Sequence, residues 1–261
     1  MGFNPYFHSA PFIEEELGNN ATVKALRSKI EHIYFYGAGA SSESLKDIIK
    51  DGLSRIMPRA MIYVDHDLVA SAYSTYTGEP AITCILGTGS NSCFFDGKTV
   101  SEEVPALAYI LGDEGSASFI GKRLVADFLY KRLPKELAED FYETYGVDKD
   151  EIITSVYNKP GANVYLASYS RFAGKHMNHD YIREIVREGF AKFADIHIAC
   201  FANCREVPVH FVGSVGAIFH ELLEDVLAER GFKMGQIMRK PVDGLIKYHI
   251  EQMDILKQYQ A

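Results

Sequence analysis

The stretch TCILGTGSNSCFF, Thr83–Phe95, decides the fold of this chain. One apolar run leads into it and another leads out, and between them lies GTGS, Gly87–Ser90. A hairpin turn between two antiparallel strands would explain the stretch but needs only one glycine. In a phosphate-binding loop, glycines let backbone N–H groups approach an anion, and Thr88 and Ser90 add hydroxyl donors. The stretch alone leaves both interpretations open.

The composition limits the classes of protein to consider. The chain has 261 residues, of which 47% are hydrophobic, enough for one large or two medium domains. The formal net charge is −8 and no basic run occurs, which argues against nucleic acid or an anionic membrane as a partner. The sequence contains neither an apolar run of membrane-spanning length nor a secretory signal at its start. We therefore expect a cytoplasmic protein.

The cysteines do not form a metal-binding pattern. Cys84 and Cys93 lie in strand-like runs, and Cys200 and Cys204 lie four apart in a predicted helix, which would put them on one face. Neither pair has the C-x₂-C spacing of a zinc or redox site. We expect buried free thiols and no metal site built from cysteine.

Strands and helices alternate in the first part of the chain. The runs at 32–36 and 61–65 are predicted strands, a helix is predicted over 42–57, and another begins near Asp67. This order favours a parallel sheet covered by helices.

A second α/β half follows a junction near residues 74–80. It begins with the antiparallel pair around GTGS and continues with predicted helices at 116–133 and 181–204. A buried strand at 207–212 and a C-terminal helix complete it. Ligands bind such sheets at the carboxyl ends of strands, so two halves predict a cleft between them.

Acidic residues and glycines mark three further candidate sites. In LGDEGSASFIG, Asp113 and Glu114 either complement a helix N-terminus or bind sugar hydroxyls or hydrated Mg²⁺. In VDHDLVASAYS, Asp67 is either an N-cap or a general base at the sheet edge. In FVGSVGAIF, Gly213 and Gly216 either allow tight packing or approach a nucleotide. The Rossmann and Walker A patterns are both absent.

The motifs GTGSNS, LGDEGS and GSVG, taken in this order, resemble a known family. Together with GFNP near the start and YLASYSRFAGKH in the middle, they resemble the N-acetylglucosamine kinases and the BadF/BadG/BcrA/BcrD ATPases. These proteins form a group of the sugar kinase–heat-shock protein 70–actin superfamily. The resemblance covers almost the whole chain.

The resemblance implies a two-domain, actin-like ATPase fold of the α/β class, built from ribonuclease H-like domains with a nucleotide cleft between them. Residues 1–77, with a C-terminal helix at about 242–261, match the N-terminal domain. Residues 78–241 match the C-terminal domain.

The resemblance also implies roles for individual residues. Asp67 matches the catalytic base. The nucleotide-binding residues would be Gly87, Thr88, Gly89, Ser90, Gly213, Ser214 and Gly216. The sugar-binding residues would be Asn4, Ser41, Asp113 and Glu114.

The implied activity is ATP- and Mg²⁺-dependent phosphorylation of an amino sugar, with N-acetylglucosamine converted to its 6-phosphate as the expected reaction. The partner is then a small sugar, and the resemblance also implies a homodimer. Two alternatives stay open. One is an ATPase activator of the BadF type, which holds an iron–sulfur cluster through cysteines; the other is a sugar sensor without catalysis.

Two departures from the family pattern qualify these expectations. The first phosphate loop, D-x-G-[GS]-T-x-T, lies upstream of GFNP in the family and is absent from this sequence. Either residues are missing before Met1, which we favour, or the chain is a truncated form that would itself be inactive. We assign the function to the complete protein. In addition, the segment before LGDEGS reads EVPALAYI instead of the family's tryptophan-bearing segment, which leaves the identity of the sugar open.

Overall fold

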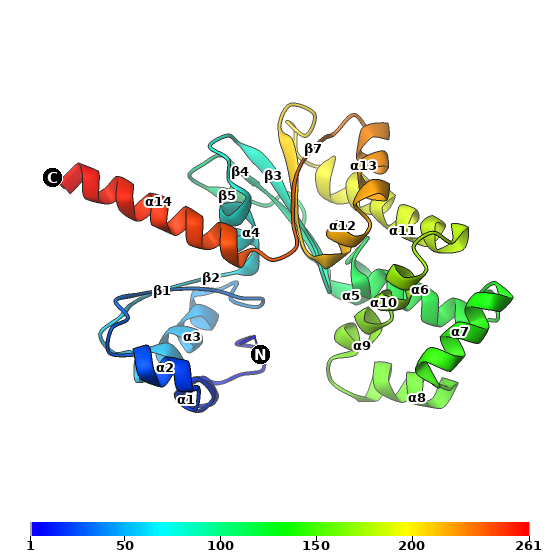
Figure 1. Cartoon of the computed structure of the whole chain (residues 1–261), viewed down its shortest axis with the longest axis horizontal. Helices are drawn as coiled ribbons and strands as arrows, with labels where there is room; N and C mark the ends of the chain where they lie inside the picture. Colours follow the sequence, from blue (N-terminus) through cyan, green and yellow to red (C-terminus); the bar gives the residue numbers. More distant parts are fainter. Residues whose placement is uncertain (1, 261) are drawn as a thin grey trace. The chain divides into compact units, whose positions relative to one another are not determined.

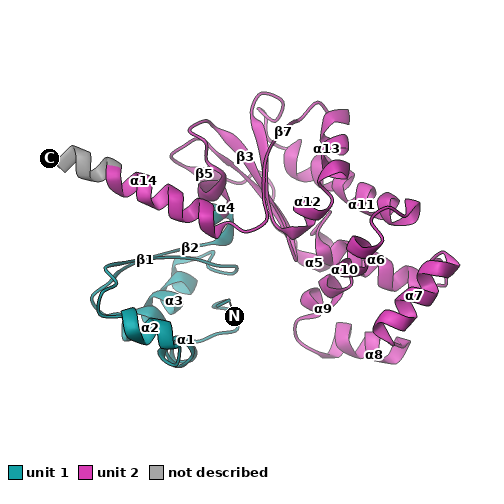
Figure 2. Cartoon of the chain, in the orientation of Figure 1, with its two compact units in different colours: residues 1–70 teal, residues 71–261 magenta. Residues whose placement is uncertain are grey.

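The computed structural model describes the backbone of residues 2–260 and the side chains of residues 2–254. The chain is of the mixed α/β class and divides into two compact units (Figures 1 and 2). Unit 1 is Met1–Ala70 and unit 2 is Ser71–Ala261.

Unit 1 contains the predicted strand–helix–strand element. Strands β1 (His32–Tyr36) and β2 (Met61–Asp65) pair in parallel, and α3 (Glu43–Ile56) connects them. Helix α3 begins where the Ser42 side chain accepts a hydrogen bond from the Leu45 N–H. The parallel pairing confirms the order predicted from the sequence.

Helices α1 (Ala10–Gly18) and α2 (Ala21–Leu26) complete unit 1. Helix α1 packs closely on α3 because Gly52 has no side chain, and a Cβ there would lie 2.8 Å from Cβ of Ile13. The buried core of the unit combines this helix pair with one face of the strands and consists of Ile13, Ala40, Ile49, Leu53, Ile56, Met57 and Val64.

Unit 2 is built on a five-stranded sheet in the order β5-β4-β3-β6-β7. The strands are β3 (Ala81–Leu86), β4 (Ser90–Phe95), β5 (Val100–Ser101), β6 (Pro208–Val212) and β7 (Lys233–Met238). Strands β3, β6 and β7 are parallel, whereas β4 and β5 run antiparallel to their neighbours. The hairpin around GTGS was predicted from the sequence, but β7 was not.

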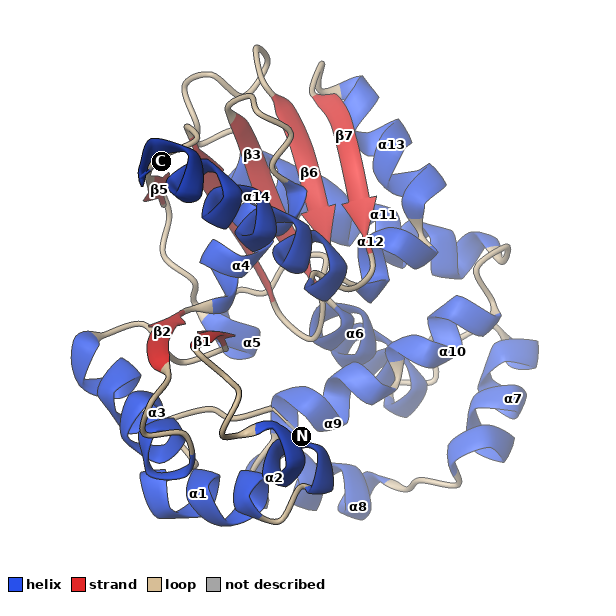
Figure 3. Ribbon diagram, turned by 60° about the vertical axis from the view of Figure 1, so that its left-hand side comes forward, coloured by secondary structure: helices blue, strands red, loops and turns tan. Residues whose placement is uncertain are grey.

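The largest core of the protein lies against one face of this sheet. Alternate residues of the strands point into it, including Ile82, Cys84 and Leu86 of β3. Helices of unit 2 cover this face, and α13 and α11 lie behind the strands in Figure 3. The opposite face contacts α4, where the hydroxyls of Thr75 and Thr83 lie 3.1 Å apart.

The helices of unit 2 follow the sheet in sequence. They are α5 (Ala108–Leu111), α6 (Ala117–Leu129), α7 (Lys135–Tyr145), α8 (Lys149–Ile153), the π-helical turn η1 (Thr154–Asn158), α9 (Ala162–Ser168), α10 (Ser170–Lys175), α11 (Asp180–Phe193), the π-helical turn η2 (Ala194–Ile198), α12 (Ser214–Ile218) and α13 (His220–Glu229). Helix α6 packs so tightly on α9 that a Cβ at Gly121 would lie 1.8 Å from the Leu166 carbonyl oxygen.

The placement of Cys200 and Cys204 corrects one prediction. The long helix predicted over 181–204 ends with η2 at Ile198, and both cysteines lie in the turns that follow. They therefore share no helix face. All four cysteines are free; Cys84, Cys93 and Cys204 are buried as expected, whereas Cys200 is only partly buried.

Helix α4 (Asp67–Thr75) spans the boundary between the units, and α14 (Val242–Gln260) packs against its second half. Tyr73 and Tyr248 stack with ring centroids 4.3 Å apart, and a Cβ at Gly244 would lie 2.2 Å from the Ser74 carbonyl oxygen. In the described part of the chain, no helix is both long and apolar enough to cross a bilayer.

Candidate active site

The GTGS stretch forms the tip of the β3–β4 hairpin. Leu86 pairs with Ser90, and the Gly87 N–H donates to the Gly89 carbonyl across the loop at 3.0 Å. The hairpin interpretation of this stretch is therefore confirmed. Whether the loop can also bind a phosphate depends on the direction in which its backbone N–H groups point.

The loop is fixed to the N-terminus of α6 by its carbonyl groups. The Ala117 N–H donates to the Gly87 carbonyl at 2.9 Å, and the Ser118 N–H donates to the Thr88 carbonyl at 3.1 Å. In a trans peptide the N–H points opposite to the C=O. The N–H groups of Thr88 and Gly89 therefore face away from α6, and within the described residues neither donates a hydrogen bond to the protein. The hairpin tip thus presents two adjacent backbone donors.

Asp113 braces this loop from the side. Its Oδ1 accepts a hydrogen bond from the Ser90 N–H at 3.1 Å, and a Cβ on Gly89 would lie 2.8 Å from the same oxygen. Burial raises the pKa of the Asp113 carboxyl above its ordinary value, although the bond from Ser90 opposes the rise. The Ser90 hydroxyl is buried and has no hydrogen-bond partner among the described residues.

Glu114 contacts a histidine that the sequence analysis missed. His197 Nε2 lies 3.4 Å from Glu114 Oε2, and its other ring nitrogen, Nδ1, is buried with no partner in the described part of the chain. His197 belongs to η2, 83 residues from Glu114 along the chain. No local pattern links the two residues, because only the packing of η2 against the loop brings them together.

The second glycine segment lies directly beside the first. Strands β3 and β6 are parallel, so their carboxyl ends meet at one edge of the sheet. Gly213 has φ 130°, and a Cβ there would lie 2.2 Å from the Leu86 carbonyl oxygen. Gly216 is buried in α12, whereas Ser214 is exposed at the start of that helix. The structure thus brings the two predicted nucleotide-binding segments together.

In unit 1, the structure brings together Asn4 and the loop after β1. A Cβ on Gly39, which has φ 85°, would lie 2.4 Å from Asn4 Oδ1. The same oxygen accepts a hydrogen bond from the Tyr6 N–H at 3.0 Å, which leaves the Asn4 amide nitrogen as the group that can reach a ligand. Ser41 is exposed at the end of the loop, immediately before the cap of α3.

The two aspartates after β2 have different surroundings. Asp65 Oδ1 accepts a hydrogen bond from the His66 N–H at 3.0 Å and lies 3.0 Å from Lys46 Nζ. Asp67 starts α4 and is exposed. The surrounding protein atoms raise the pKa of the Asp67 carboxyl by desolvation, against the opposing effect of His66. Asp65 therefore has an ion pair with Lys46, whereas the distinguishing feature of Asp67 is the raised pKa of its carboxyl.

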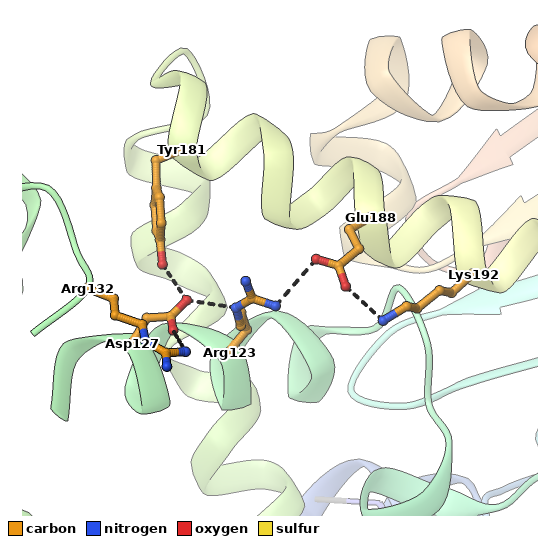
Figure 4. Close-up of polar contacts among 6 residues, drawn as sticks. All are labelled: Arg123, Asp127, Arg132, Tyr181, Glu188 and Lys192. Carbon is orange, nitrogen blue, oxygen red and sulfur yellow. Dashed lines mark hydrogen bonds and ion pairs between the residues drawn. The ribbon is translucent and has the colours of Figure 1, made fainter. Parts of the chain in front are cut away.

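A polar clamp joins α6, on which the loop rests, to α11 (Figure 4). The clamp is defined as Arg123, Asp127, Arg132, Tyr181, Glu188 and Lys192. At its centre the Asp127 carboxylate accepts hydrogen bonds from the Tyr181 hydroxyl at 2.5 Å and from Arg123 Nε at 2.7 Å. Arg123 also reaches Glu188 of α11 at 3.3 Å. The clamp holds α6 in place and thereby the base of the phosphate-loop candidate.

We expect Asp127→Asn to lower the free energy of unfolding by about 1.5–3 kcal/mol at neutral pH. Only 4% of the Asp127 side chain is exposed, and burial alone would raise its pKa. The bonds from Tyr181 and Arg123 outweigh this effect and hold the pKa below its ordinary value. The stabilisation is thus present above the unfolded-state pKa and is lost as the pH falls through the folded-state pKa.

Urea titrations at neutral and acid pH test this expectation. The difference between wild type and Asp127→Asn should shrink as the pH falls, and Asp225→Asn, at an exposed position on α13, is the control. A difference that stays constant down to acid pH would show that the clamp carboxylate is not the stabilising group.

The surroundings of the cysteines bear on the iron–sulfur alternative. Within the described residues, no group of three or more His, Cys, Asp or Glu side chains is arranged to hold a metal ion. Cys84 and Cys93 are buried in strands, where burial raises the pKa of both thiols, that of Cys93 to about 12. Protonated, buried thiols are poor ligands for a cluster.

Comparison with known proteins places the chain in a family. No protein-family model and no curated protein matches it. A solved structure from Porphyromonas gingivalis, named a "putative N-acetylglucosamine kinase", is 34% identical with a TM-score of 0.90, over 95% of this chain and 88% of that chain. A second, from Chromobacterium violaceum and with the same name, is 18% identical with a TM-score of 0.63, over 80% and 73% of the two chains, and shows the shared fold. By its identity to the P. gingivalis protein along almost its whole length, the chain belongs to the N-acetylglucosamine kinase family of sugar kinases.

Proposed function

We propose that the complete protein transfers the γ-phosphoryl group of ATP to a hydroxyl of an amino sugar, with N-acetylglucosamine as the acceptor and its 6-phosphate as the product. The observation that carries this proposal is the pair of outward-facing N–H groups of Thr88 and Gly89 on a hairpin anchored to α6. The name of the P. gingivalis relative supports N-acetylglucosamine as the acceptor.

The hairpin tip has the donors that a nucleotide phosphate needs. The N–H groups of Thr88 and Gly89 and the hydroxyl of exposed Thr88 would bind non-bridging phosphate oxygens. The Ser90 hydroxyl has no partner among the described residues, but it is buried, so it would reach a phosphate only if the hairpin tip shifts. Gly213, Ser214 and Gly216, on the adjacent strand end, would flank the nucleoside.

The residues present also fit Mg²⁺ bound together with ATP. Mg²⁺ keeps several waters and binds proteins through one or two carboxylates and substrate phosphates, so no larger set of protein ligands is needed. Asp113 lies beside Gly89 and uses one of its oxygens for the Ser90 N–H, which leaves the other for such a contact. When bound, Mg²⁺ neutralises charge that develops on the transferred group.

Asp67 would act as the base that takes the proton from the sugar hydroxyl as it attacks phosphorus. Asn4 and Ser41 of unit 1, and Asp113 and Glu114 of unit 2, would hold the hydroxyls of the sugar. This arrangement requires the two-domain, actin-like organisation, with a nucleotide cleft between residues 1–77 plus the C-terminal helix and residues 78–241. A homodimer is proposed on the same family grounds.

A coupled assay of ADP release on the complete protein, with a panel of hexoses and amino sugars, tests the proposal. Turnover that depends on an amino sugar supports it and names the substrate. ATP hydrolysis that is the same with and without every sugar would favour the ATPase activator. Sugar binding without any turnover would favour the sensor.

The Ser90→Ala variant separates phosphate binding from folding. The Ser90 hydroxyl is buried and unpartnered, so its removal should leave the melting temperature unchanged or slightly raise it. If the hydroxyl binds a phosphate, the KM for ATP should rise by about tenfold, the value of one hydrogen bond to a charged group. Melting curves and ATP titrations measure the two effects. An unchanged KM for ATP would remove Ser90 from the nucleotide site.

A further inference from the structure

Unit 2 has a second concave site, which the proposed reaction does not use. A cavity of about 640 Å³ lies among α5, α6, α8, η1 and α9. We refer to it as the α6–η1 pocket, lined by Tyr109, Ile110, Lys122, Val125, Ala126, Leu129, Tyr130, Lys149, Ile152, Ile153, Val156, Tyr157 and Leu166. Its volume falls within the range of small-molecule sites, and most of its wall is aliphatic or aromatic.

The charges of the α6–η1 pocket are all of one sign. Lys122 of α6 and Lys149 of α8 line it, and none of the lining residues is an aspartate or glutamate. This contrasts with the net charge of −8 of the whole chain. A pocket that is positive within an acidic protein selects anions by charge complementarity.

Aromatic side chains at the pocket add an amphipathic rim. Tyr130 is 70% exposed and Tyr157 is 76% exposed, so both rings are open to a ligand at the mouth of the pocket. A tyrosine offers an apolar ring and a hydroxyl donor to the same ligand. The ligand that satisfies both the apolar wall and the two lysines has a hydrocarbon body and one negatively charged head group.

We propose that the α6–η1 pocket binds an organic monoanion of this kind, a medium-chain aliphatic carboxylate, with its chain against Val125, Ile152 and Val156 and its carboxylate at Lys122 and Lys149. The pocket walls exclude water from the hydrocarbon chain of the ligand. Burial of each of its methylene groups contributes about 0.8 kcal/mol to the free energy of binding. The ammonium groups of Lys122 and Lys149 would position the carboxylate of the ligand by charge attraction.

The pocket is connected to the candidate active site through Lys122. Lys122 Nζ donates to the Tyr109 carbonyl of α5 at 2.8 Å, and α5 runs directly into Gly112 and Asp113. The positive charge of Lys122 also lowers the pKa of Asp113, against the effect of burial. A carboxylate that attracts Lys122 competes with the Tyr109 carbonyl and loosens α5. If the proposed kinase function holds, the bound anion therefore changes the KM for sugar or ATP.

Isothermal titration of the full chain with decanoate, below its micellar concentration, tests the binding directly. We expect saturable one-to-one binding, with decyltrimethylammonium, a cation with the same chain, binding at least about tenfold more weakly. Lys149→Glu and Ala126→Phe, which reverse a charge at the pocket and fill its volume, should each weaken decanoate binding by about tenfold or more. Lys159→Glu, an exposed lysine outside the pocket lining, is the matched control and should bind as wild type.

Three outcomes of the titrations would overturn this proposal: no saturable binding of decanoate, equal binding of the cation, or equal binding by Lys149→Glu and wild type. Lys149 is exposed, so its variant should fold even if Ala126→Phe does not. Light scattering gives a further test. If wild type is a dimer and both Lys149→Glu and Ala126→Phe are monomers, the pocket is covered by a second copy of the chain, and the proposal is overturned. These results do not depend on turnover, so failure of the kinase assay leaves the binding test intact.

Discussion

Asp67→Asn should abolish sugar-dependent ADP release by the complete protein, with a loss of about 10²–10⁴-fold in kcat, the usual contribution of a general base. The amide has nearly the shape of the carboxylate but cannot take the hydroxyl proton from the sugar. Since the effect is on proton transfer, the KM for ATP should change little. The assay is the coupled measurement of ADP with the sugar that wild type prefers.

Asp65→Asn is the matched control, two residues away on the same strand-to-helix junction. It removes the ion pair with Lys46 and should lower stability modestly while keeping most of kcat. Equal losses of kcat in both variants would mean that neither carboxylate is the base and that the junction itself was disturbed.

The pH dependence of kcat/KM in the wild type also tests whether Asp67 is the base. Desolvation raises the pKa of Asp67, so kcat/KM should begin to fall, on acidification, at a pH above the ordinary value for an aspartate. The reason is that the protonated carboxyl can no longer accept a proton. This acid limb should remain in Asp65→Asn.

Gly213→Ala should have the largest structural effect of any substitution at the site. Its φ of 130° is one that residues with a side chain rarely adopt, and a Cβ would lie 2.2 Å from the Leu86 carbonyl oxygen and 3.1 Å from the Gly87 N. Those contacts are backbone atoms of β3 and of the hairpin tip, so they cannot move without displacing the loop. We expect a loss of about 3 kcal/mol or more in the free energy of unfolding, or failure to fold, by backbone strain and overpacking.

Gly216→Ala, three residues further along, is the control for this variant. A Cβ there would meet its nearest neighbours at 3.6 Å, an ordinary contact, and the residue lies in α12. The change should be close to neutral, within about 1 kcal/mol, because alanine favours a helix. Urea unfolding of both variants measures the difference. A well-folded Gly213→Ala protein with normal ATP binding would show that the two glycine segments are not packed together as described.

Much of the local structure could be predicted from the sequence because it depends on neighbouring residues. The hairpin of β3 and β4 follows from two apolar runs around GTGS, and the parallel pair of β1 and β2 follows from alternating strand and helix patterns. Strand β7 was missed because KMGQIM does not alternate apolar and polar residues, and it forms a strand by pairing with β6, with a register shift between Val209 and Phe211. The helix predicted through Cys204 ends at Ile198, because an apolar pattern does not show where the backbone hydrogen bonds stop.

Some features of the candidate site could likewise be predicted from the sequence, whereas others depend on the tertiary structure. The sequence by itself determined the order of the motifs, the glycines that a close backbone approach needs, and the family, which the relative from P. gingivalis confirms. Only the tertiary structure decided which way the GTGS amides face, because their direction depends on carbonyl bonds to α6 some 30 residues away. It also decided that Asp113 braces the loop, that His197 meets Glu114, and that α6 is clamped to α11 through Asp127. These contacts join residues far apart in the chain, and short-range sequence patterns carry no information about which distant side chains will meet.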